Sequence, residues 1–104
     1  MSQFTVYANA DPASRKLMPY FLNLQSDLID TAGSRVVVPL ISPERAAPVI
    51  DHLMPLLAVG DKDMVMDTAQ IAGVPRRMLG EPVADLSAER HTILSALDLL
   101  ISGI

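Results

Sequence analysis

The sequence predicts an α+β fold that is mainly β, in which a small, curled, mostly antiparallel sheet carries one helix. Three observations lead to this prediction. Short apolar segments rich in β-branched residues follow one another through the first 80 residues, turn residues separate them, and one uninterrupted helical pattern closes the chain. Successive strands followed by a terminal helix are typical of a barrel-like sheet with a helix attached. We expect one domain, 1–104.

Three strands are predicted in the N-terminal half. QFTVYA at 3–8 alternates in steps of two, which is the period of a half-buried strand. YFLNLQ at 20–25 is the second strand, and the turn residues DTAGS at 30–34 follow it. RVVVPLI at 35–41 is a β-branched run typical of a buried strand, which we expect to break at Pro39.

The middle of the chain predicts a single helical turn and a hairpin. SPER at 42–45 can start a turn in which Ser42 is the cap and Pro43 takes the first helical position. PLLAVGDKDMVMDT at 55–68 indicates two strands that fold about Gly60-Asp61-Lys62.

The last quarter predicts a short strand, a loop and the helix. RRMLG at 76–80 is the strand and EPVADLS at 81–87 is the loop. Ser87 is the expected N-cap, Glu89 is favourable in the first turn, and the helix continues to Gly103. One helical stripe is apolar and is expected to pack on the sheet or on a symmetry mate: Ile93, Leu97, Leu100 and Ile104, flanked by Leu94, Ala96 and Ile101. The opposite face is polar: His91, Ser95, Asp98 and Ser102.

Composition restricts the classes of function. Eight Lys and Arg against twelve Asp and Glu give a formal charge of −4, and the only local basic clusters are Arg15-Lys16 and Arg76-Arg77, so we expect no direct binding of nucleic acid. There is no cysteine, which excludes disulfides and thiolate metal sites. The N-terminal segment has no signal-peptide pattern and the longest apolar runs are too short to span a bilayer, so the expected location is cytoplasmic, without membrane binding.

The residues that could carry chemistry do not form a recognisable active site. Ser87 and His91 lie four apart on the helix near Asp85, but no nucleophile-elbow motif surrounds the serine. His52 is isolated. Asp61, Asp63 and Asp67 are part of a calcium-loop pattern that lacks its glycine and its closing glutamate, so a charged hairpin tip is favoured. We expect no catalytic residues, no metal and no cofactor.

Some residues remain open to two interpretations. Met54, Met64, Met66 and Met78 suit core filling better than an adaptable binding surface. Arg76-Arg77 suits a solvated strand face. On its residues alone the terminal SGI is a frayed helix end, with Gly103 as the C-cap.

Three stretches, taken in order, resemble the CcdB family of bacterial toxins. They are QFTVY at 3–7, LQSDLIDTAGSRVVVPL at 24–40, and VP at 74–75 leading through GEPVADLS at 80–87 to a helix that ends in GI. The resemblance implies an SH3-like antiparallel β-barrel with a smaller sheet and one C-terminal helix, assembled as a homodimer. It also implies a toxin that binds the DNA gyrase A subunit, traps the enzyme on cleaved DNA and catalyses nothing itself.

The resemblance also implies the contact residues. The ends of the two C-terminal helices would meet near the dimer axis and contact gyrase. The implied gyrase-binding residues are Gln3, Phe4, Ser26, Leu28, Asp98, Ser102, Gly103 and Ile104. Two positions depart from the family pattern: Ser102 stands where the best-known toxins have Trp, and RRML at 76–79 is less apolar than the family strand.

The family's second partner would be a cognate CcdA-like antitoxin whose disordered tail folds onto the toxin. The acidic balance of this chain favours a tail with basic and apolar residues. Two alternatives to gyrase poisoning stay open: a toxin of the same fold whose target is altered or lost, as Ser102 suggests, and an RNA-cleaving toxin of the related MazF-type barrel. The charge of −4 argues against RNA cleavage.

Overall fold

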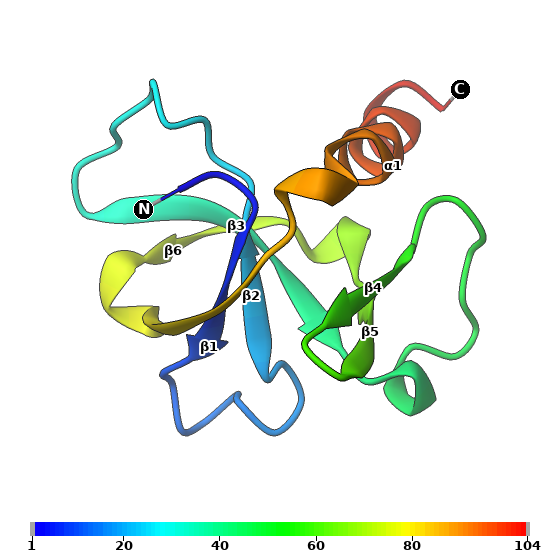
Figure 1. Cartoon of the computed structure of the whole chain (residues 1–104), viewed down its shortest axis with the longest axis horizontal. Coiled ribbons are helices and arrows are strands. Elements are labelled where there is room, and N and C mark those ends of the chain that lie inside the picture. The colour runs from blue at the N-terminus through cyan, green and yellow to red at the C-terminus, as the bar shows by residue number, and fades with distance from the viewer. Residues whose placement is uncertain (1, 104) are drawn as a thin grey trace.

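The computed structural model describes residues 2–103. Within that range the chain forms seven strands, shown in Figure 1: β1 (Thr5–Asn9), β2 (Tyr20–Asn23), β3 (Ser34–Ile41), β4 (Leu56–Val59), β5 (Lys62–Met66), β6 (Ala72–Pro75) and β7 (Leu79–Asp85). The helix α1 (Arg90–Ser102) follows them. Single 3₁₀ turns lie at Pro43–Arg45, Thr68–Gln70, Arg76–Met78 and Ser87–Glu89.

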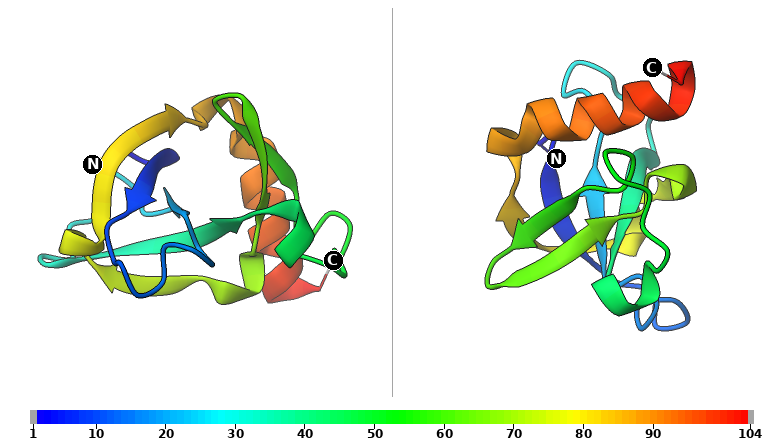
Figure 2. Two further views of the ribbon diagram at one scale, coloured as in Figure 1. Left: turned by 90° about the horizontal axis from the view of Figure 1, so that it is seen from below. Right: turned by 90° about the vertical axis from the view of Figure 1, so that its right-hand side faces the viewer.

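The strands form one curled antiparallel sheet in the order β4-β5-β3-β2-β1-β7, and β6 pairs with β3 outside this path. One edge of the long strand β3 has two partners in turn: β6 along residues 34–37 and β5 at residues 40–41. Figure 2 shows that the sheet bends around its interior and that α1 lies across one end of it. The prediction of an α+β fold that is mainly β, with a curled antiparallel sheet and one C-terminal helix, is confirmed.

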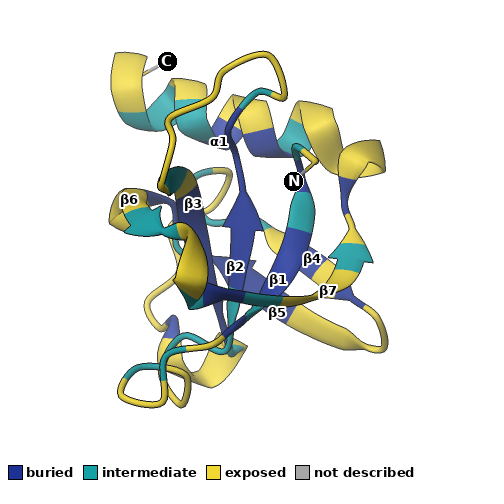
Figure 3. Ribbon diagram, turned by 90° about the vertical axis from the view of Figure 1, so that its left-hand side faces the viewer, coloured by how far each residue is buried: buried dark blue, intermediate teal, exposed yellow. Residues whose placement is uncertain are grey.

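The core lies between the concave side of the sheet and α1. Its fully buried members come from alternate positions of the strands, such as Val6, Leu22 and Val38, and from Ile93 and Ala96 of the helix. Figure 3 shows this buried zone on the strands and on the side of α1 that faces them.

The predicted apolar stripe of the helix is confirmed at its described members and at flanking Ala96, but the flanking Leu94 and Ile101 are exposed, because they lie at the margin of the stripe that turns toward solvent. Ile93 is completely buried, and Leu97 and Leu100 are half-buried. The residues of the opposite face, His91, Ser95, Asp98 and Ser102, are exposed or border on solvent. Ile104, the last member of the apolar stripe, lies outside the described residues.

The predicted strands at 3–8, 20–25 and 55–68 are confirmed with shifted ends. The hairpin turns on Gly60-Asp61, and Gly60 has a φ of 64°, which its lack of a Cβ allows. Lys62 belongs to β5 and pairs with Val59. The turn after Ser42 also forms, as the 3₁₀ turn Pro43–Arg45, but the Ser42 side chain makes no capping hydrogen bond.

The expected break at Pro39 is wrong, because β3 runs through it. The Pro39 carbonyl accepts a hydrogen bond from the Asp67 N–H, so the missing Pro39 N–H also points to that edge of β3. On that edge of β3, the pairing with β6 stops at Val37 and the pairing with β5 starts at Leu40. Proline therefore occupies a position where no ladder hydrogen bond is lost.

The expected strand at 76–80 and loop at 81–87 are also wrong. Arg76–Met78 is a 3₁₀ turn, and the strand β7 begins at Leu79 and continues to Asp85. β7 is the last strand of the sheet order and pairs with β1 through two irregular register shifts. An edge position tolerates Pro82 and leaves most of its side chains exposed, which is why the segment has the pattern of a loop.

Candidate functional site

The loop between β2 and β3 is built around Gln25. This side chain is almost completely buried, and its Oε1 accepts the Val36 N–H at 3.0 Å. Its Nε2 donates to the Ile29 carbonyl at 2.7 Å and to the Thr31 hydroxyl at 3.0 Å. These hydrogen bonds close the loop from within, so its remaining side chains project outward from a fixed backbone.

Ser26 and Leu28 lie on this loop. The Ser26 hydroxyl accepts the Leu28 N–H at 3.2 Å, and the Ser26 carbonyl accepts the Ile29 N–H at 3.1 Å. Leu28 is 93% exposed and Ile29 is 57% exposed. The loop therefore presents two apolar side chains to solvent on a hydrogen-bonded support, which is typical of a contact surface.

Gln3 and Phe4 adjoin the base of this loop. The Gln3 N–H donates to the Asp27 carboxylate at 2.7 Å, and its side-chain amide donates to the Leu24 carbonyl at 3.1 Å. Phe4 is only 3% exposed and belongs to the core, with a φ of 66°. Its ring therefore anchors the segment, while Gln3 remains accessible.

Arg90, at the start of α1, joins this group to the helix. Its guanidinium carbon lies 5.5 Å from the centre of the Phe4 ring, a cation–π distance, and its Nη1 donates to the Gln3 Oε1 at 3.4 Å. Sequence reasoning did not single out Arg90. The available signal was its helical spacing from Leu94 and Asp98, which are four and eight residues further on.

The other end of α1 carries the remaining candidates. The Ser102 hydroxyl donates to the Asp98 carbonyl at 2.6 Å. Gly103 has a φ of 74°, and its N–H donates to the Leu99 carbonyl at 2.9 Å, so it is the left-handed C-cap that ends the helix. Ser102 and Gly103 are exposed, and neighbouring Ile101 is 82% exposed. The eighth candidate, Ile104, lies outside the described residues.

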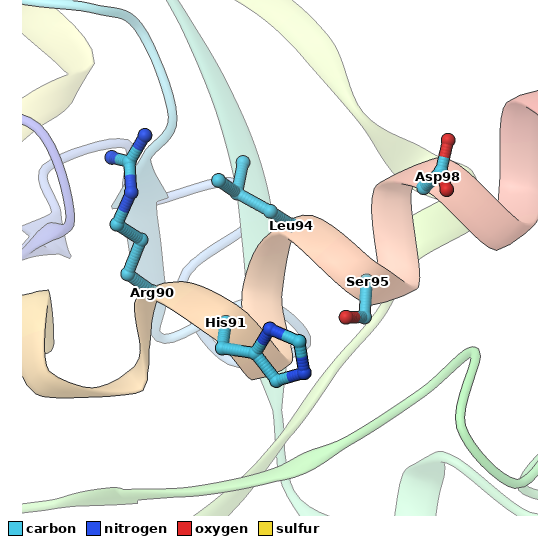
Figure 4. A pocket seen from close by; sticks show the side chains of 5 residues that line it. All are labelled: Arg90, His91, Leu94, Ser95 and Asp98. Carbon is cyan, nitrogen blue, oxygen red and sulfur yellow. The ribbon is translucent and has the colours of Figure 1, made fainter.

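The structure thus gathers the candidates into two groups on one chain. The N-terminal group contains Gln3, Phe4, Ser26 and Leu28, and the helix tip contains Asp98, Ser102 and Gly103. Arg90, which contacts the first group, and Ser102 of the second group lie about 18 Å apart along the axis of α1. Arg90, Leu94 and Asp98 border a surface depression of about 600 Å³ along α1, together with His91 and Ser95 (Figure 4), so this surface of the helix connects the two groups.

The start of α1 differs from its prediction. Ser87 is not the N-cap, because it lies inside the 3₁₀ turn Ser87–Glu89 that precedes α1. The Asp85 carboxylate instead accepts the Ser87 N–H at 2.9 Å. This backbone hydrogen bond, aided by one from the Ser87 side chain, holds the pKa of Asp85 below its ordinary value.

The other candidate clusters assemble no reactive site in the part of the chain that the structure describes. The carboxylate of Asp85 is engaged by Ser87, and no hydrogen bond joins Ser87 to His91 within residues 2–103. The same residues contain no group of three or more His, Asp or Glu side chains placed to hold a metal ion. Met64 and Met66 are buried in the core, as their core-filling interpretation predicted.

Two further findings concern the whole chain. No helix formed by residues 2–103 has the length and apolar character needed to cross a membrane. The family model described as CcdB protein matches residues 3–103. The match covers both groups of the candidate site, apart from Ile104, and it agrees with the curled sheet and terminal helix. The chain therefore belongs to the CcdB family, the gyrase-targeting toxins of toxin–antitoxin modules.

Proposed function

We propose that this protein binds the A subunit of DNA gyrase, traps the gyrase–DNA cleavage complex, and is neutralised by a cognate CcdA-like antitoxin. The family match over residues 3–103 carries this proposal. The mechanism is differential binding: a toxin that binds the cleaved state more tightly than the other states shifts the gyrase cycle toward it. A toxin that acts in this way needs an exposed contact surface and no catalytic acid, base or nucleophile of its own.

The exposed tip of α1 supports the proposal. Gly103 ends the helix without a side chain, and among residues 2–103 no atom outside the adjoining helix lies within 4 Å of the position of a Cβ there, so a partner backbone has room to approach. Ile101 supplies an exposed apolar side chain one turn from the end. Asp98 adds a carboxylate on the same turn, which can accept hydrogen bonds from the partner.

The N-terminal group extends this surface. Leu28 offers an exposed apolar side chain, and the side chain of Gln3 is held between the Leu24 carbonyl and Arg90. Because the group contacts the start of α1 through Arg90 and the tip is at its other end, one partner would have to span the length of the helix to reach both. In the homodimer that the family resemblance implies, the helix tips of the two chains would lie close to the symmetry axis.

Ser102 favours a second candidate, a toxin of this family whose target is altered or lost. Its small hydroxyl is bonded back to the Asp98 carbonyl, so it offers a partner little apolar area. Tryptophan at this place would supply one of the commonest interface hot spots. The two candidates differ only in whether gyrase is bound.

A gyrase cleavage assay tests the proposal. Supercoiled plasmid, purified gyrase and ATP are incubated with the full chain, and linear DNA is counted after detergent and protease treatment. We expect linear DNA to accumulate with wild type and not with a variant that lacks Gly103 and Ile104. His52→Ala is the control, because His52 is exposed on a different loop. The proposal would be contradicted if the amount of linear DNA were the same with and without the toxin. It would also be contradicted if the toxin cleaved RNA in a parallel reaction that contains no gyrase.

A further inference from the structure

The strand β4 is the last strand at one end of the sheet, and within residues 2–103 its one partner strand is β5. The Met66 N–H donates to the Pro55 carbonyl at 3.0 Å, which places residue 55 in a hydrogen-bonded pair. Hydrogen-bonded and non-hydrogen-bonded pairs alternate along an antiparallel ladder, so Leu57 and Val59 also bond to β5. The peptide groups of Leu56 and Ala58 consequently point away from the sheet, with their N–H and C=O groups available.

Neither of these two edge positions is occupied by a charged residue or a proline. Natural sheets guard their edges with charges, prolines or covering segments. Leu56 is 58% exposed and Ala58 is also exposed, and neither side chain is charged. Leu56 stands opposite buried Val65, so its side chain extends a small apolar cluster onto the surface. An open edge with an apolar face is the surface on which an extended peptide adds a strand.

A cleft lies beside the start of this strand. It has a volume of about 550 Å³, with Asp51, His52 and Pro55 on one wall and residues of α1, including His91 and Ser95, on the other. His91 and Ser95 also border the depression that connects the two groups of the candidate site (Figure 4). The cleft therefore adjoins that depression along α1, whereas the edge positions Leu56 and Ala58 line neither of them.

The charges around this edge are mainly acidic. Asp51 is 95% exposed at its side chain, Asp61 forms the hairpin turn, and Asp63 stands directly opposite Ala58. Lys62 is the one cation among residues 51–67. A second copy of this chain would bring the same aspartates to both sides of a shared edge, whereas a basic segment would be attracted to them.

We propose that the free edge of β4 binds an extended segment of the antitoxin tail as an added strand, a segment in which apolar residues alternate with Lys or Arg. The identity of the partner rests on the proposed function, while the docking mode rests on the hydrogen-bond pattern of β4. The backbone of the tail pairs with the peptide groups of Leu56 and Ala58. Its apolar side chains cover Leu56, and its cations approach Asp63 and Asp51.

Hydrogen exchange tests the docking mode at single positions. The probe is a synthetic peptide of the C-terminal tail of the antitoxin encoded with this toxin, added to saturation to the full-length ¹⁵N-labelled chain. We expect the exchange of the Leu56 and Ala58 amides to slow by about tenfold or more, because their N–H groups become hydrogen-bonded. The Leu57 and Val59 amides, already bonded to β5, serve as internal references. Unchanged exchange at both edge amides in the saturated complex would overturn the proposal.

A matched pair of variants tests the same edge by affinity. Ala58→Pro removes the edge N–H and places a ring against the incoming strand, while the ladder to β5 is left intact. Ala58→Val keeps the N–H in a strand-compatible residue. We expect Ala58→Pro to weaken tail binding about tenfold and Ala58→Val to retain it. Asp63→Asn should reduce the salt dependence of binding. Equal affinities for the Pro and Val variants would overturn the proposal.

Failure of this inference is distinguishable from failure of the proposed function. Ala58→Pro should still trap gyrase in the cleavage assay, because β4 lies outside both groups of the candidate site. Gyrase trapping by wild type and by Ala58→Pro, with full tail binding by both, would retain the proposed function and overturn the docking mode. Tail-dependent protection of the edge without gyrase trapping would retain the docking mode and overturn the gyrase target. A tail peptide that does not bind at all would overturn the docking mode.

Discussion

At the scale of single residues, two side chains that lie outside the apolar core organise the helix and the loop beside it. Asp85 accepts the Ser87 N–H at the start of the helical segment, and Gln25 closes the loop that carries Leu28. Both are polar residues whose partners are backbone groups. Their roles depend on the path of the backbone, so a pattern of apolar residues contains no signal for them.

The Asp85 interaction predicts a pH-dependent change in stability. Because the pKa of Asp85 is lowered in the folded state, its ionised form stabilises the fold above the ordinary value of 3.8, and this contribution is lost as pH falls through the lowered pKa. We expect Asp85→Ala to lower the Tm at pH 7 and the difference from wild type to shrink below pH 3.8. Thermal unfolding followed by circular dichroism measures it.

The matched control is Asp67, whose pKa is raised because burial disfavours its charged form. Its ionised form therefore disfavours folding, so Asp67→Asn should not lower the Tm at pH 7. A loss of stability in Asp85→Ala that persists unchanged in acid would contradict the capping role of the carboxylate.

Substitution of Ser102 is expected to change the affinity of this protein for gyrase. We expect Ser102→Trp to tighten binding of the gyrase A fragment by about 1–3 kcal/mol, because an aromatic side chain at an interface buries a large apolar area. Calorimetry against the fragment measures this change. Ser102→Ala is the control, since it removes the hydroxyl without adding area. Equal affinities for all three proteins would remove this position from the interface.

At the scale of elements, α1 combines two functions on one helix. Its inner side completes the core through Ile93, while its outer side and its tip remain exposed.

The edge strand β7 was missed by sequence reasoning because an edge strand with one proline and few buried residues resembles a loop. The short strand β6 was also missed, because Gly73 interrupts the pattern and its partner is the distant start of β3.

A pair of isoleucines separates the two sides of α1. Ile93 is fully buried, so Ile93→Ala should lower the free energy of unfolding by about 2–5 kcal/mol through lost burial and a new cavity. Ile101 is 82% exposed, so Ile101→Ala should leave the unfolding of a dilute sample almost unchanged. Urea denaturation compares the two. A large loss for Ile101→Ala at every protein concentration would mean that its side chain is buried within the single chain.

At the scale of the whole molecule, we propose an isologous homodimer. The outer apolar residues of α1, Leu94 and Ile101, are exposed on the single chain, and two-fold assembly would cover such a surface. We expect light scattering to give twice the chain mass at micromolar concentration and Ile101→Asp to shift the mass toward the monomer. Ile50→Asp, on the loop before β4, is the control, since Ile50 is the same residue type and is also exposed, at 57%. A wild-type monomer would contradict the proposed dimer.

The fold class, the hairpin at Gly60, the terminal helix and the buried side of that helix could all be predicted from the amino-acid sequence, because they follow from local periodicity and turn residues. The sequence also contains the family resemblance that the match over residues 3–103 bears out. The folded structure was needed to show that Pro39 lies in a continuous strand, that β7 is a strand, and that Arg90 packs on Phe4. It was also needed to show that the candidate residues form two groups, one beside the start of α1 and one at its end. These features depend on which distant backbone groups become neighbours, and strand order and edge position are properties of the assembled sheet.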